Sequence, residues 1–131
     1  MQELCYRLLS DLRKIGITES FSLELRPYSK TYFGRYDPNL NKIVLYVYED
    51  SKRTRFLPYE DLLNTLIHEA VHCIQWSSES FVRRKGVMHD AEFYSLLNSY
   101  TDKAKSMLLL KEIRDAKVSN TLMVKFSEVH C

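Results

Sequence analysis

Residues 62–76 read LLNTLIHEAVHCIQW, and this stretch decides the fold. Its apolar residues recur with a helical period, and Pro58 followed by Glu60 and Asp61 is typical of the start of a helix. We therefore expect a helix that begins just after Pro58 and ends near Trp76. Most of this helix should be buried, so the polar residues inside it are informative.

Two histidines in this helix, His68 and His72, are four positions apart, so their imidazoles lie on one face and can bind a single ion. Zinc suits imidazole ligands, and a catalytic zinc site has three protein ligands and a water. Glu69 lies beside the pair, where its carboxylate can take a proton from the metal-bound water and pass it to the leaving amine of a peptide. These residues predict a cofactor, one Zn²⁺ per chain, and a catalytic role for Glu69.

The third ligand must come from elsewhere in the chain. His89 is the leading candidate because it opens the next helical pattern, and the connection from Ser77 to Val87 is long enough for that helix to fold back antiparallel to the first. Glu92, one turn further on the same face, is the alternative ligand. If His89 binds the metal, Glu92 would instead orient a ligand imidazole or pair with an arginine.

Hydrophobic periodicity elsewhere predicts an α+β fold. Residues 2–15 should form an amphipathic N-terminal helix, and residues 89–116 should form one long C-terminal helix or two shorter ones. A small three-stranded antiparallel sheet is expected between them, with strands at residues 21–26, 31–36 and 43–48 and a turn at residues 37–41. Residues 122–126 are interpreted as a short strand or a fraying tail.

Composition is that of an ordinary globular protein. The chain has 131 residues, 27% charged and 45% hydrophobic, and a net charge of +2, too small to indicate nucleic-acid binding. Three cysteines without paired spacing argue against a disulfide framework. With no signal peptide pattern or membrane-spanning run, we expect one monomeric domain over residues 1–131, in the cytoplasm or associated with the nucleoid. The basic clusters at residues 52–55 and 83–85 are expected to be solvated loops.

The combination of motifs resembles the SprT-like zinc metalloproteases, the family that includes Spartan. The match consists of residues 65–72, Trp76 four positions beyond the second histidine, residues 89–93, and an upstream hairpin pattern at residues 34–45. It covers about residues 30–100. Two features depart from the family: Met88 and Asp90 flank His89 where the family has glycines, and no paired cysteines of a C-terminal zinc ribbon are present.

This resemblance implies a minimal gluzincin-like domain in which His68, His72 and His89 bind zinc and Glu69 is catalytic. It also implies that an edge strand between Tyr32 and Tyr48 binds the backbone of a protein or peptide substrate by strand addition. DNA is only a weakly supported partner. We therefore expect a zinc-dependent endopeptidase of SprT-like type, acting on proteins that include nucleic-acid-associated ones.

Two other functions fit the same residues. One is a zinc-bound interaction module that recruits a partner through the edge strand without cleaving it. The other is a regulatory protease resembling ImmA and IrrE, which cleaves a repressor; Trp76 and residues 89–93 favour the SprT-like interpretation. Trp76 and Cys73 are expected in the core. Most of the tyrosines are expected to be packing residues, but a single hydroxyl among them can stabilise the oxyanion, the candidates being Tyr32, Tyr36, Tyr46, Tyr48, Tyr59 and Tyr94.

Overall fold

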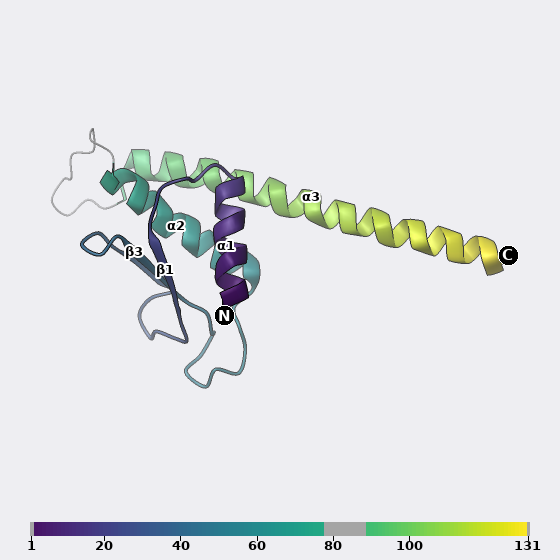
Figure 1. Cartoon of the computed structure of the whole chain (residues 1–131), viewed down its shortest axis with the longest axis horizontal. Coiled ribbons are helices and arrows are strands. Elements are labelled where there is room, and N and C mark those ends of the chain that lie inside the picture. Colours follow the sequence, from purple (N-terminus) through teal and green to yellow (C-terminus); the bar gives the residue numbers. More distant parts are fainter. Residues whose placement is uncertain (1, 78–88, 131) are drawn as a thin grey trace.

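The structure, a computed structural model, describes residues 2–77 and 89–130, with side chains up to residue 115 (Figure 1). Its elements are α1 (Gln2–Lys14), β1 (Ser22–Arg26), β2 (Gly34–Asp37), β3 (Lys42–Tyr46), α2 (Tyr59–Ser77) and α3 (Ala91–His130). The expected α+β class, with an N-terminal helix, a small sheet and two further helices, is confirmed.

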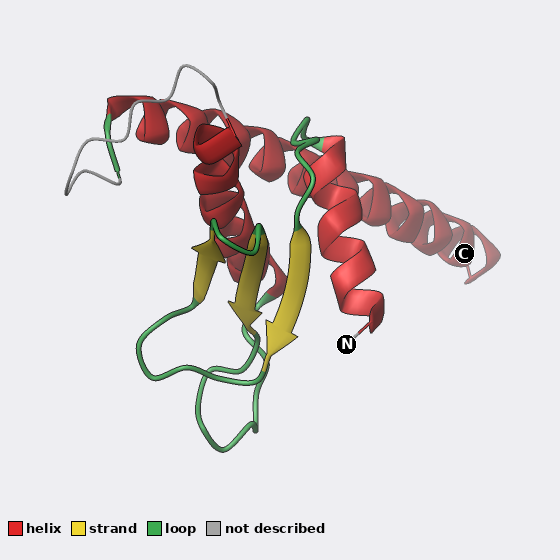
Figure 2. Cartoon of the chain, turned by 60° about the vertical axis from the view of Figure 1, so that its left-hand side comes forward, coloured by secondary structure: helices red, strands yellow, loops and turns green. Residues whose placement is uncertain are grey.

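Helix α2 is the centre of the fold. It packs against β2 and β3 on one side and against α3 on another, while α1 contacts both α2 and β1 (Figure 2). Leu63, Leu66, Ile67 and Val71 of α2 are fully buried, and each buried aliphatic side chain of this size contributes about 1.5–3 kcal/mol. This burial orients α2 about its axis and therefore determines which of its residues face outward.

The sheet is mixed, so the expectation of an antiparallel sheet is wrong in this respect. The strand order is β1-β3-β2; β2 pairs antiparallel with β3 through a hairpin, but β1 pairs parallel with β3. The reason lies in the segment of residues 27–33 between β1 and β2, which is too long for a tight turn and carries the chain to the far edge of the sheet. The apolar strand β3 then returns between the other two, where its residues 43–46 are buried. Strand β2 is thus left at an edge.

Helix α3 is one continuous helix whose C-terminal part extends away from the other elements (Figure 1). The expectation of a strand or a fraying tail at residues 122–126 is wrong, because the chain from residue 105 to 130 contains no Gly or Pro to end the helix. The basic residues 52–55 are exposed, as expected. The connection from Ser77 to Val87, with its basic cluster at residues 83–85, lies outside the described residues apart from Ser77.

Among the described helices, none has both the length and the apolar character needed to cross a bilayer. The expected cytoplasmic or nucleoid-associated location stays a prediction, as does the monomeric state.

Candidate metal centre and cleft

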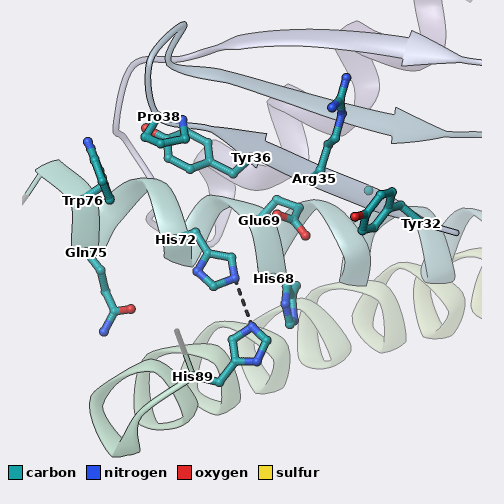
Figure 3. Close-up of a pocket in the computed structure, with 11 residues that line it drawn as sticks. Tyr32, Arg35, Tyr36, Pro38, His68, Glu69, His72, Gln75, Trp76 and His89 are labelled. Atoms are coloured by element: carbon teal, nitrogen blue, oxygen red, sulfur yellow. Dashed lines mark hydrogen bonds between the residues drawn. The ribbon is translucent and has the colours of Figure 1, made fainter. Parts of the chain in front are cut away.

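Three histidines converge at the place where α2 meets the start of α3. His68 and His72 project from one face of α2, and His89 lies two residues before α3 begins. One nitrogen of each imidazole can be chosen so that all three lie within 4.8 Å of one another. The Nε2 atoms of His72 and His89 are 3.2 Å apart, and Figure 3 shows these two rings pointing toward each other.

A fully buried phenylalanine, Phe93, packs against all three imidazoles of this cluster. Its ring centroid lies 5.0, 4.5 and 4.6 Å from those of His68, His72 and His89, respectively. The sequence predicted Phe93 as an apolar position of the last helix and as part of the matched stretch at residues 89–93, but its spacing gave no sign that it would contact all three imidazoles. An aromatic platform of this kind restricts the rotamers of the histidines and keeps their nitrogens close together.

The donor set fits a tetrahedral metal such as zinc. Two nitrogens bound to one tetrahedral zinc at about 2.0–2.1 Å lie about 3.3 Å from each other, close to the observed separation of His72 and His89. Burial, together with the neighbouring imidazoles of His68 and His89, lowers the pKa of His72 to about 4. Burial and His89 also lower the pKa of His68. Both imidazoles are therefore neutral at pH 7, the form that binds a metal.

Glu92, the alternative third ligand, is not part of this cluster. Its side chain is exposed, and its carboxylate accepts a hydrogen bond from Gln75 Nε2 at 3.5 Å. The structure brings His89, and not Glu92, together with His68 and His72.

The carboxyl group of Glu69 lies beside the histidines and is only 8% exposed. Burial raises its pKa to about 7, although a hydrogen bond with the backbone of Tyr36 acts in the opposite direction. A carboxyl group whose pKa lies near neutrality can both accept and donate a proton during turnover. The position and the electrostatics of Glu69 therefore suit a general base.

A cleft of about 560 Å³ opens beside Glu69 and the three histidines (Figure 3). One wall is the edge strand β2 with its flanking residues, and the opposite wall is α2 with His89. Gly34 allows β2 to approach α2 closely, since a Cβ atom there would lie 2.7 Å from Thr65 Cγ2.

Trp76 forms one end of this cleft and is 41% exposed, so the expectation that it packs in the core is wrong. It follows His68 and His72 at intervals of four residues, and this face of α2 borders the cleft. Cys73, one position after His72, is buried as expected. The spacing of Trp76 relative to the histidines therefore predicts its position at the cleft better than its size and apolar character do.

Gln75 was not singled out in the sequence, although it is a polar residue in a mostly apolar stretch. Its side chain is only 2% exposed, and its amide donates hydrogen bonds to Asp90 Oδ1 at 3.3 Å and to Glu92 Oε1 at 3.5 Å. Asp90 in turn accepts the backbone N–H of Phe93 at 2.8 Å, which caps the N-terminus of α3. Gln75 thus links the end of α2 to the residue beside His89.

Two of the candidate tyrosines, Tyr32 and Tyr36, line the cleft. The hydroxyl of Tyr36 donates to Asn41 Oδ1 at 2.9 Å, which directs it to the hairpin turn. The hydroxyl of Tyr32 faces the same space as Glu69 (Figure 3). Tyr32 is thereby the better placed of the two for contact with a substrate.

The chain resembles a known protein family and two solved structures. A family model described as the WLM domain matches residues 19–120. The crystal structure of Wss1 from Saccharomyces cerevisiae is similar with a TM-score of 0.62 and 20% identity, over 82% of this chain and 79% of that chain. The zymogen of the Pyrococcus abyssi metallopeptidase abylysin gives a TM-score of 0.48 and 18% identity, over 82% and 93%. The likeness to Wss1 shows a shared fold. No curated protein sequence matches the chain.

Proposed function

Since the chain belongs to the WLM domain family of Wss1-like and SprT-like metalloproteases, we propose that it is a zinc-dependent endopeptidase. The family confirms the expected resemblance and supports a metal-dependent protease in general terms. The proposal of zinc-dependent endopeptidase activity rests on one observation: a buried glutamate and three converging histidines share a cleft with an edge strand. Family membership also favours the SprT-like interpretation over an ImmA- or IrrE-like one.

His68, His72 and His89 would hold one zinc ion through their neutral imidazoles. When bound, zinc supplies a Lewis acid that acidifies water and polarises a peptide carbonyl. Glu69 accepts the proton of the attacking water at its carboxylate and later gives that proton to the leaving amine. Its burial strengthens this role because the surroundings hold the pKa of the carboxyl group near neutrality.

We propose that the substrate binds as an extended segment along β2. The order of the sheet leaves one side of Gly34–Asp37 without a neighbouring strand, and this strand lines the cleft that contains Glu69. Strand addition there would place a substrate backbone beside the histidines. Tyr32 would donate its hydroxyl to the oxyanion of the tetrahedral intermediate. Proteins with exposed or unfolded segments, including those associated with nucleic acid, are the substrate class that this arrangement fits.

The test compares the wild type with Glu69→Gln on an unfolded protein and on extended fluorogenic peptides, with zinc content measured in parallel. Removing a general base lowers the rate by roughly 10²- to 10⁴-fold, whereas a neutral amide of similar size leaves the zinc content, and the thermal unfolding of the zinc-loaded protein at neutral pH, unchanged. Full activity in the variant would remove Glu69 from the base role. Tight zinc binding without turnover of any extended substrate would favour the alternative, a zinc-bound interaction module that uses the same edge strand.

A further inference from the structure

The cleft continues past Glu69 into a second cavity of about 550 Å³. The two cavities share Tyr32, Gly34, His68 and Glu69, so they lie on either side of the proposed catalytic residues. Along α2 the second cavity borders residues 64–69 and the first borders residues 68–76. Along the opposite wall the second cavity borders residues 31–34 and the first borders residues 32–38. An extended substrate lying on β2 would therefore enter both cavities.

The two cavities differ in chemistry. Arg35, Tyr36, Pro38 and Trp76 line only the first. The second is lined by the carboxamides of Asn64 and Asn98 and by Thr101, which come from the facing helices α2 and α3. Apart from Glu69 and His68, the residues that line it are uncharged.

The two carboxamides are available to a ligand. In the part of the chain that the structure describes, no hydrogen bond or ion pair engages the side chain of Asn64 or Asn98. The hydroxyl of Thr65 differs, because it donates to the carbonyl of Asp61 at 3.0 Å. Asn64 is half-buried and Asn98 is exposed, so both carboxamides can be reached from the cavity that they line.

We propose that this second cavity is a substrate side-chain subsite that selects a carboxamide, glutamine or asparagine, on one side of the scissile bond. This inference rests on the proposed peptidase function. A carboxamide offers both donors and an acceptor, so it can pair with Asn64 and Asn98 at once. A carboxylate would meet the negative charge of Glu69, and an apolar side chain would bury both asparagine amides without partners.

The test measures kcat/KM on peptide pairs that differ only by glutamine or leucine at each position flanking the cleaved bond. We expect the wild type to prefer glutamine by roughly 10- to 100-fold at one position, as sites built to hydrogen-bond a substrate discriminate against analogues that lack the group.

Asn98→Leu and Asn64→Leu should abolish this preference. Asn98→Asp should shift it toward lysine, and this polar variant tests the subsite even if a leucine variant does not fold. Ser99→Leu, a neighbouring exposed position of α3 outside the cavity, is the matched control and should retain the preference.

A binding measurement separates this proposal from the peptidase function. The single tryptophan of the chain, Trp76, lines the adjoining cavity, so its fluorescence can report the Kd of the same peptide pairs for Glu69→Gln without turnover. Tighter binding of the glutamine peptide that depends on Asn98 supports the subsite even if no peptide is cleaved by the wild type. Equal binding and equal cleavage of the two peptides, or a preference unchanged in both asparagine variants, would overturn the subsite and leave the peptidase function standing.

Discussion

His72 and His89 place their Nε2 atoms 3.2 Å apart although 17 positions separate them in the chain. Both rings rest on Phe93, which belongs to the same segment as His89. The fold therefore forms the cluster by packing one end of α3 against α2. Loss of either imidazole, or of the packing between these helices, should affect the proposed zinc site.

We predict about one zinc per chain after dialysis against a weak chelator, and its loss in His68→Ala, His72→Ala and His89→Ala. A catalytic zinc site has three protein ligands, and among the described histidines, cysteines and carboxylates this triad is the group whose ligand atoms lie close enough to share one ion. Elemental analysis of the purified proteins measures the zinc content.

Glu92→Ala is the control for that series, because Glu92 lies outside the cluster and contacts Gln75. It should retain zinc. Loss of zinc in this variant together with retention in His89→Ala would show that the carboxylate is the third ligand. A folded wild type without zinc would contradict the metal site altogether.

Gln75→Leu should weaken zinc binding without removing a ligand. The substitution deletes the hydrogen bond from Gln75 to Asp90, the residue next to His89. Loss of such a supporting interaction typically costs roughly 10- to 100-fold in metal affinity. Competition with a chromophoric chelator measures the affinity.

Cys73→Ala is a suitable comparison for Gln75→Leu, since Cys73 is also buried in α2 and its thiol donates to Asn41 Oδ1 in the hairpin turn at 3.5 Å. It should lower the unfolding temperature and leave the zinc affinity close to that of the wild type. An equal loss of affinity in both variants would indicate that Gln75 acts only through overall stability.

Local spacing predicted much of this site, whereas packing between distant segments determined the rest. The face shared by His68 and His72 follows from helical periodicity alone. The parallel pairing of β1 with β3 does not, because it depends on where the segment between β1 and β2 crosses the sheet. Gln75 and Phe93 acquire their roles only when α3 folds onto α2, and no pattern within α2 indicates that contact.

The metal-free protein should lose stability as the pH falls from about 6.5 to about 4. Burial lowers the pKa of folded His72 to about 4, whereas the unfolded value is about 6.5. Between these values the unfolded chain binds a proton that the folded chain does not, so lowering the pH favours unfolding. His68 acts in the same direction. Glu69 opposes the destabilising effect of the two histidines, because its raised pKa makes the folded chain bind a proton as the pH falls below about 7.

The melting temperature of chelator-treated Glu69→Gln, recorded across this pH range, isolates the effect of the histidines. It should fall more steeply with decreasing pH than that of the wild type, and His72→Phe in the same background should flatten the dependence. A pH-independent melting temperature in Glu69→Gln would show that the imidazoles are solvated in the folded state.

Gly34→Ala should destabilise the chain and reduce cleavage. Gly34 has no unusual backbone φ, so the effect would be steric: the added Cβ would lie 2.7 Å from Thr65 Cγ2 and 3.1 Å from the carbonyl oxygen of Val44. Strand β2 would have to move away from α2, which widens the cleft beside Glu69. Overpacking of this kind costs about 1–3 kcal/mol.

Thr65→Ser removes the obstructing methyl but keeps the hydroxyl that donates to the carbonyl of Asp61, so in the Gly34→Ala background it should partly restore both stability and kcat/KM. Thermal unfolding of the wild type, both single variants and the double variant forms a double-mutant cycle. Additive effects would mean that Thr65 does not set the distance between β2 and α2.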